Sequence, residues 1–258
     1  MLKLNYLLRA LLYPAGAPRN STVFQHILRK PRVFDIISCL LQLRDHRRLL
    51  KIHDASPKDE FYSKVKGYNA GITQQKVIST TRRAETLYQI LSFPPRDLSK
   101  EKLLIVGPRN VQELFIAWLY GFTWKNILAI DLYSTNPKIL VVNMERLTFR
   151  NESFDAVVMA NTLAYARDTL QCLSEVSRVL KCGGRFVFGA TYFPESVDWP
   201  GNRICGNEIL AMLRKLSFNL VFYYAIDKIN SLGGKQTVHI FSVEKEDPSH
   251  PGFDGITW

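Results

Sequence analysis

The sequence has few cysteines, few histidines and no long apolar run. Four cysteines occur in 258 residues, and they show neither the paired spacing of a zinc site nor the density of a disulfide-stapled fold. This usage predicts a reducing compartment, and we expect a cytoplasmic protein. The five histidines form no metal-ligating spacing with cysteines or carboxylates, so we expect no metal site. No apolar stretch is long enough to cross a bilayer, which predicts a protein that is at most peripheral to a membrane.

Acidic residues are missing from the first 34 positions. Residues 1–100 contain 18 Lys and Arg against 7 Asp and Glu, whereas residues 101–258 contain 16 of each sign, so the N-terminal part carries the whole net charge of +11. A basic and leucine-rich opening suits an anionic membrane surface, and it also resembles an organelle transit sequence. Nucleic acid is a second class of partner for such charge, and a docking helix with solvated charges is a third interpretation.

The rest of the first hundred residues is expected to be mainly helical. Apolar spacing predicts a helix over residues 32–50, and its packing face comprises Val33, Phe34, Ile37, Leu40 and Leu41. A polar loop over residues 54–60 and a second helix over residues 74–91 follow. Two prolines then indicate a linker over residues 92–100. We therefore expect a basic, mainly helical region over residues 1–100, a domain over residues 101–246 and a tail over residues 247–258.

Beyond the linker, apolar strands alternate with helices. Leu103–Val106 is a continuous apolar run, typical of a parallel strand buried on both faces, and it stops at a turn that begins with Gly107. Asn110 then opens an apolar helix as its N-cap, with Glu113 three residues later in the position of a capping box. Gly121 follows the helix, where a C-terminal glycine is expected. The pattern predicts a strand, a tight turn and a helix.

The next strand, over Asn126–Ile130, ends at an acid. Asp131 follows 24 positions after Gly107. A carboxylate at the end of the second strand accepts hydrogen bonds from both hydroxyls of a ribose. This order is how an open α/β sheet holds an adenosyl cofactor.

With three later segments, this order resembles the class I S-adenosylmethionine-dependent methyltransferases. The segments are Val141–Phe149, in the place of the family's adenine motif, Asn151–Ala160, in the place of its fourth strand, and Leu180–Gly189, in the place of the turn and fifth strand. The resemblance implies an α/β fold with a Rossmann-like, doubly wound, mostly parallel sheet and an antiparallel last strand. It also implies S-adenosylmethionine as the cofactor and a methyl acceptor that the sequence does not identify, with a small molecule or a lipid or glycan precursor expected.

The resemblance further implies a set of cofactor-binding residues: Gly107, Arg109, Asp131, Leu132, Asn143, Met144 and Asn161. The glycine-rich turn departs from the family's pattern, because Ile105 stands in the place of an acid, and Arg109 and Val111 stand in the places of glycines. We expect Arg109 to pair with the carboxylate of the cofactor, and Asn143 to accept a hydrogen bond from the adenine amino group. The altered turn also favours a second interpretation, a methyltransferase-like fold that serves as a non-catalytic binding or scaffold module.

The catalytic candidates are Asn161 and Tyr165, which follow the fourth strand, where relatives place residues that face the sulfonium and the acceptor. Residues 190–203 are predicted to form a lid over the acceptor, and Tyr62 and Tyr68 are candidates to cover the methyl donor. No Asn-Pro-Pro-aromatic sequence follows the fourth strand, which counts against N-methylation of bases. An RNA-directed methyltransferase that uses the basic N-terminal region stays an alternative.

Overall fold

The computed structural model of this chain describes residues 23–46, 51–52, 60–75, 84–93, 96–108, 110–134, 136–195, 199, 201–229 and 234–247. The helices are α2 (Val23–Leu28), α3 (Pro31–His46), α4 (Glu60–Gln75), α5 (Glu85–Leu91), α6 (Val111–Leu119), α7 (Thr169–Val179) and α8 (Gly206–Lys215). The strands are β1 (Lys51–Ile52), β2 (Leu103–Val106), β3 (Ile127–Asp131), β4 (Tyr133–Ser134), β5 (Ile139–Val141), β6 (Phe154–Ala160), β7 (Leu180–Tyr192), β8 (Phe218–Ile229) and β9 (Lys235–Lys245).

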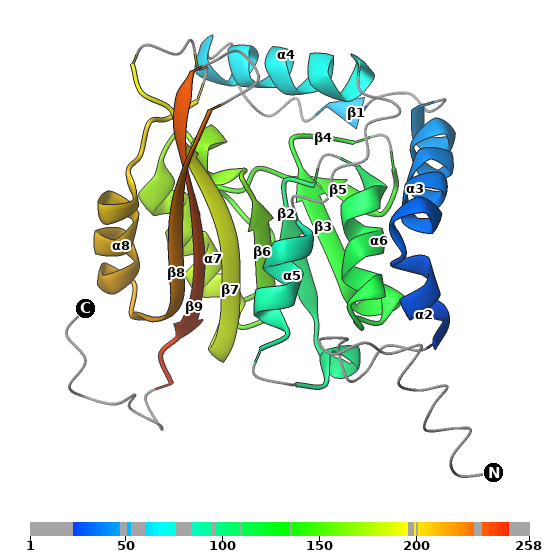
Figure 1. The fold of residues 1–258 in the computed structure, drawn as a ribbon. Coiled ribbons are helices and arrows are strands. Elements are labelled where there is room, and N and C mark those ends of the chain that lie inside the picture. The colour runs from blue at the N-terminus through cyan, green and yellow to red at the C-terminus, as the bar shows by residue number, and fades with distance from the viewer. Residues whose placement is uncertain are drawn as a thin grey trace.

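Seven strands form one sheet in the order β5-β3-β2-β6-β7-β9-β8, with helices on both faces (Figure 1). The strands from β5 to β7 are parallel to one another, whereas β9 runs antiparallel to both of its neighbours. The predicted α/β fold, with a mostly parallel sheet and an antiparallel last strand, is therefore confirmed. In addition, β1 and β4 form a small antiparallel pair.

The sheet separates two apolar cores, and the central strands contribute to both. In β2, Leu103 and Ile105 pack with α5 and α6, while Leu104 and Val106 pack with the core under α7 and α8. All four side chains are almost completely buried. Successive side chains of a strand point to opposite faces, so a strand covered on both sides needs the unbroken apolar run seen in the sequence.

The ends of helix α6 lie where the sequence predicts them. The side chain of Asn110 caps the helix by accepting a hydrogen bond from the backbone N–H of Gln112, at 3.0 Å. After the helix, Gly121 has a φ of +110°, which L-residues with a side chain rarely adopt. The turn predicted at Gly183 and Gly184 is a bulge at the start of β7, where the pairing with β6 shifts its register.

Helix α3 forms a further layer outside α6. Phe34 stacks on Phe115 of α6, with ring centroids 6.1 Å apart, and Val33, Ile37 and Leu41 pack against the same core. The prediction that Leu40 belongs to this packing face is wrong, because its side chain is 61% exposed. At 100° per residue, Leu40 lies on the side of the helix that α6 does not reach.

The helix predicted over residues 74–91 is confirmed over α5, Glu85–Leu91. Gln74 and Gln75 end α4, and α5 begins only at Glu85. Residues 76–83 lie outside the described part of the chain. Apolar spacing alone does not show that α5 begins at Glu85, after Ala84 as its N-cap.

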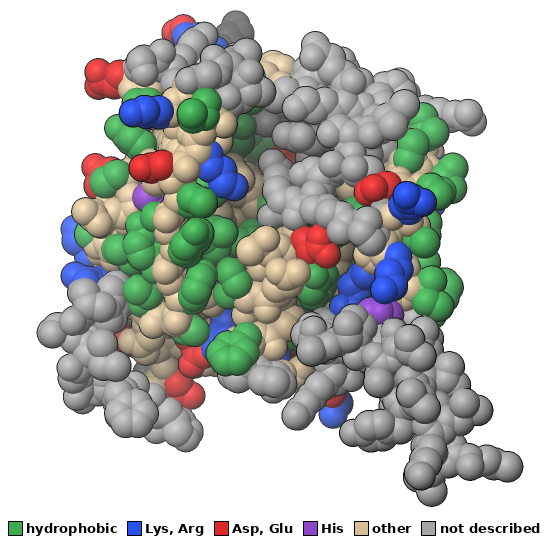
Figure 2. Space-filling view, viewed as in Figure 1, with side chains coloured by type: hydrophobic (Ala, Val, Ile, Leu, Met, Phe, Trp, Pro, Cys, Tyr) green, Lys and Arg blue, Asp and Glu red, His purple; other side chains and the backbone are tan. Residues whose placement is uncertain are grey.

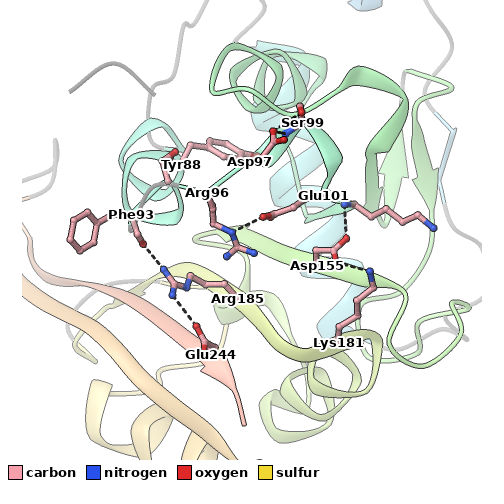
Figure 3. A network of polar contacts seen from close by, with 12 residues as sticks. Tyr88, Phe93, Arg96, Asp97, Ser99, Glu101, Asp155, Lys181, Arg185 and Glu244 are labelled. Carbon is pink, nitrogen blue, oxygen red and sulfur yellow. Dashed lines mark hydrogen bonds and ion pairs between the residues drawn. The ribbon is translucent and has the colours of Figure 1, made fainter. Parts of the chain in front are cut away.

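A network of charged side chains lies at the amino ends of β2, β6 and β7 (Figure 3). The guanidinium of Arg185 bonds Glu244 at 2.9 Å and also donates to the backbone carbonyl of Phe93. On the next strand, Asp155 accepts from the ammonium of Lys181 at 2.5 Å and from the N–H of Lys102 at 2.8 Å.

A neighbouring pair in the same network joins Arg96 to Glu101 at 2.6 Å. Burial raises the pKa of the Glu101 carboxyl, and the charge of Arg96 opposes that rise. These contacts join the segment after α5 to the sheet, at the edge opposite the carboxyl ends of the parallel strands. Their position indicates a structural role.

Candidate functional site

The carboxyl ends of β2, β3, β5, β6 and β7 meet at one edge of the sheet, beneath α4 (Figure 1). The chain leaves β2 toward β3 and β5 on one side, and later enters β6 and β7 on the other side. The winding therefore reverses between β2 and β6, and open α/β sheets bind ligands at such a reversal. Gly107, Asp131, Asn143 and Asn161 each follow or end one of these strands, so the fold brings these four predicted site residues to one edge.

The turn after β2 makes close contact with the turn after β6. Gly107 has a φ of +68°, and a Cβ on it would lie 2.2 Å from Cγ2 and 2.4 Å from Oγ1 of Thr162. The Thr162 hydroxyl donates to the carbonyl of Gly107 at 3.1 Å. Only glycine fits this position. Val111, which stands in a glycine place of the family, is the first residue of α6 and is buried, while Arg109 lies outside the described residues.

Asp131 ends β3 and is half-buried. Its Oδ1 accepts a hydrogen bond from the N–H of Leu132 at 2.6 Å, which orients the carboxylate at the strand end. Leu132 packs in a small apolar cluster with Tyr133 and Tyr62, with Phe61 against its edge. Leu132, one of the predicted cofactor-binding residues, therefore lies beneath the first turn of α4.

Asn143 connects the same region to α4. Its Oδ1 accepts from the N–H of Glu145 at 2.8 Å, and its Nδ2 donates to the hydroxyl of Tyr62 at 3.3 Å, across 81 positions of sequence. Burial is the main cause that raises the pKa of Tyr62 well above its ordinary value, and a hydrogen bond to Glu145 is the second. The phenol therefore keeps its proton. Met144 is buried in the core beside α7. Tyr62 thus covers the edge at Leu132 and Asn143, where the sequence analysis places the adenine.

Asn161 follows β6 in a strained conformation. Its φ is +58°, unusual for a residue with a side chain, and its N–H donates to the carbonyl of Gly189 at 3.1 Å. The side-chain oxygen is buried, and no donor reaches it among the described residues. A Cβ on Gly189 would lie 2.7 Å from that oxygen. Strained backbone together with an unsatisfied polar atom is typical of functional sites.

Four aromatic side chains from α4 and from the segments after β6 and β7 contact one another. Tyr165 lies 5.2 Å from Trp199 between ring centroids, and Tyr68 of α4 lies 6.4 Å and 5.8 Å from these two rings. Phe193 stacks on Trp199 at 4.3 Å. Nε1 of Trp199 is buried, with no acceptor among the described residues. We refer to Tyr68, Tyr165, Phe193 and Trp199 as the aromatic cluster.

A pocket of about 10 Å³ adjoins the aromatic cluster, and its lining is uncharged: Leu163, Ala164, Ala190, Thr191, Asn202, Ile204 and Ile209. This volume holds about one water molecule.

Two residues at this edge of the sheet were not predicted from the sequence as part of the site. Glu145 accepts hydrogen bonds from the N–H groups of Arg167 and Asp168, and so joins the segment after β5 to the one after β6. Thr162 bonds Gly107, as described above. Neither residue has a sequence signal, because each role depends on a partner far away in the chain. In the part of the chain that the structure describes, no group of His, Cys, Asp and Glu side chains is arranged to hold a metal ion.

Comparisons with known proteins agree with the fold described above. Residues 119–188 match the family model described as a methyltransferase domain, whereas no curated protein matches the chain. A proposed methyltransferase from Bacillus halodurans C-125 is 14% identical, with a TM-score of 0.52 over 62% of this chain and 99% of that one.

Two further solved structures have similar scores. A proposed methyltransferase of Haloferax volcanii, solved with the Trm112 methyltransferase activator, is 17% identical, with a TM-score of 0.52 over 74% of this chain and 100% of that one. A proposed sarcosine dimethylglycine methyltransferase from Galdieria sulphuraria is 12% identical, with a TM-score of 0.51 over 68% and 88%. At such identities the likeness shows the fold.

Proposed function

We propose that this chain, whose domain has the class I fold of S-adenosylmethionine-dependent methyltransferases, transfers the methyl group of that cofactor to a small, largely uncharged acceptor. The observation that carries the proposal is the meeting of Gly107, Asp131, Asn143 and Asn161 at one sheet edge, under a helix that covers it. The family match and the fold support S-adenosylmethionine as the cofactor.

The polar groups at this edge fit the cofactor. The carboxylate of Asp131 stands at the end of β3, and two carboxylate oxygens match the two hydroxyls of a ribose. The amide oxygen of Asn143 has a second lone pair beside the one that Glu145 occupies. The buried oxygen of Asn161 lacks a donor among the described residues, and the ammonium group of a bound cofactor would supply one.

S-adenosylmethionine, when bound, supplies an electrophilic methyl group on a sulfonium, which an acceptor atom attacks in line with the departing thioether. The main task of the residues of this chain is to position the cofactor and the acceptor and to enclose them. Tyr62 lies over the edge of the sheet and is held there by the hydrogen bond from Asn143. This cover helps to keep water away from a bound cofactor. The rings of Tyr165 and Trp199 offer an uncharged, largely apolar surface for such an acceptor.

The first experiment is calorimetric titration with S-adenosylmethionine and S-adenosylhomocysteine. Asp131→Asn keeps the size of the side chain and the bond to Leu132 but removes the charge. Since hydrogen bonds to charged groups contribute roughly 1.5–3 kcal/mol, we expect at least a tenfold loss of affinity. The matched control is Asp227→Asn, an exposed aspartate of β8 whose Oδ1 accepts from the Thr237 hydroxyl at 2.8 Å.

The outcomes separate the two functions considered from the sequence. The proposed site is supported if Asp131→Asn weakens cofactor binding and Asp227→Asn leaves it unchanged. Methyl transfer is then tested by adding fractions of a low-molecular-weight extract and measuring the formation of S-adenosylhomocysteine. Binding without turnover in any fraction favours the non-catalytic module. Absence of binding to folded protein contradicts the proposal.

A further inference from the structure

Helix α3 has two apolar faces, although it packs against the protein with only one. The inner face carries Phe34 and Leu41 and lies against α6. On the outer face, Ile36, Leu40 and Leu43 are 62%, 61% and 42% exposed. Their spacing of four and three positions places them in one stripe along the helix. A surface helix of a globular protein normally has polar residues on its outer side, so this stripe indicates a surface that something covers.

Helix α2 extends this apolar surface. Phe24 and Ile27, three positions apart, are 61% and 44% exposed. Figure 2 shows hydrophobic side chains along the right-hand margin of the molecule, over α3 and α2, with Lys and Arg side chains beside them. We refer to these two residues, the stripe of α3 and the adjacent basic residues Lys30, Arg32 and Arg44 as the α2–α3 face.

The charge around this surface is positive. Lys30, Arg32 and Arg44 are all exposed. Arg32 lies four positions before Ile36, and Arg44 lies four positions after Leu40, so the two arginines stand at either end of the stripe. Residues 23–46 contain four Lys and Arg against two Asp and Glu, and the sequence before residue 23 adds three Lys and Arg and no acid.

A second exposed apolar surface lacks this charge. Nine consecutive residues of β8, Val221–Ile229, are exposed, and they include Phe222 and Tyr224. Asp227 and Lys228 are the charged residues among them and cancel each other. The β8 surface therefore matches the α2–α3 face in hydrophobicity but not in charge.

We propose that the α2–α3 face docks on an anionic lipid surface. Ile36, Leu40 and Leu43 enter the boundary between headgroups and acyl chains, while Lys30, Arg32 and Arg44 lie against lipid phosphates. Apolar side chains between basic ones are typical of helices that lie in a membrane interface. None of the helices in the described part of the chain is long and apolar enough to cross a membrane, so the helix lies on the surface. This proposal does not depend on the reaction that the protein catalyses.

The test is co-sedimentation of the full chain with vesicles of phosphatidylcholine alone or with about one-third phosphatidylglycerol. We expect binding to the anionic vesicles and little to the neutral ones. Ile36→Gln combined with Leu40→Gln should lower the partition coefficient roughly tenfold or more, because two exposed side chains lose their apolar burial. Lys30→Gln combined with Arg32→Gln should lower it about fivefold for each charge removed.

The β8 surface offers a matched control for each variant. Val221→Gln combined with Ile229→Gln removes two exposed apolar side chains, and Lys228→Gln combined with Lys235→Gln removes two exposed charges; neither should change vesicle binding. Thermal unfolding and cofactor titration of every variant report on folding independently.

Three results would overturn the proposal. The first is equal binding to neutral and anionic vesicles. The second is a dimer in light scattering that Ile36→Gln with Leu40→Gln converts to a monomer, which would make this face a contact between two copies. The third is binding to an RNA oligonucleotide but not to vesicles.

Discussion

Replacement of Gly107 by alanine tests whether this position must be glycine because the turns after β2 and β6 lie so close together. The new Cβ would lie 2.2 Å from Cγ2, 2.4 Å from Oγ1 and 2.7 Å from Cβ of Thr162. The backbone also has a φ of +68°. The substitution therefore has two separate costs, one from the dihedral angle and one from the overlap.

The sizes of both costs follow from general values. A residue with a Cβ in the left-handed region costs roughly 1–2 kcal/mol, and forced overpacking costs typically about 1–3 kcal/mol. We expect Gly107→Ala to lower the free energy of unfolding by about 2–5 kcal/mol in total. This is a large part of the roughly 5–15 kcal/mol that stabilises an ordinary domain.

Gly183 allows the two costs to be measured separately. Its φ is also +68°, but a Cβ there would meet nothing within 4 Å. Gly183→Ala should therefore cost only the dihedral part. Thr162→Gly removes all three clashing atoms. In that background, the loss of unfolding free energy caused by Gly107→Ala should fall to the loss caused by Gly183→Ala.

Urea unfolding of the five proteins measures these free energies. A Gly107→Ala cost no larger than that of Gly183→Ala would refute the reasoning, because it would mean that the two turns separate without penalty. An unchanged cost in the Thr162→Gly background would assign the effect to another contact.

The remaining predictions concern three residues, Tyr62 in the site and His239 and Arg185 away from it. Tyr62→Phe removes the hydroxyl that bonds Asn143 and should weaken cofactor binding severalfold. Because the pKa of Tyr62 is raised by burial, its contribution to stability is complete below about pH 10 and is lost above that value, so wild-type stability should fall more steeply than that of Tyr62→Phe in urea unfolding at high pH. Burial lowers the pKa of His239, so stability should fall as the pH drops below about 6.5, and His239→Gln should flatten this dependence between pH 7 and pH 5. Arg185→Met breaks the ion pair with Glu244 and should cost about 2 kcal/mol in urea unfolding, less than a fully buried pair because Glu244 is 40% exposed. The same variant should leave the calorimetric affinity for the cofactor unchanged, since the pair lies at the opposite edge of the sheet; a changed affinity would contradict the structural role given to this network.

Local sequence predicts much of the sheet domain, because its central elements follow local rules. The run Leu103–Val106 is a strand with the predicted bounds, since a strand buried on both faces must be apolar at every position. Asn110 caps α6 and Gly121 follows it with a positive φ, because both needs arise within a few residues of the helix ends. Asp131, Asn143 and Asn161 share an edge for a topological reason: parallel strands all end on one side.

The helical N-terminal region was predicted less well. Leu40 was assigned to the packing face of α3, yet it is exposed, because apolar character does not reveal which arc of the helix a neighbour will cover. Of the helix predicted over residues 74–91, Gln74 and Gln75 belong to α4, whose start at Glu60 was not predicted, and Glu85–Leu91 form α5, because apolar spacing alone does not mark where one helix ends and another begins. The domain boundaries and the compartment stay predictions.

By itself the sequence determined the strands, the caps and the order in which polar residues follow strand ends, because each depends on neighbours within one or two turns. Only the tertiary structure decided that Tyr62 bonds Asn143, that Thr162 presses on Gly107, and that Tyr68 joins Tyr165 and Trp199. These contacts join segments that lie dozens of positions apart. The contacts of Tyr62 and Tyr68 depend on the packing of α4 over the sheet edge, and the contact of Thr162 with Gly107 depends on the pairing of β2 with β6. No local rule of spacing or composition predicts either arrangement.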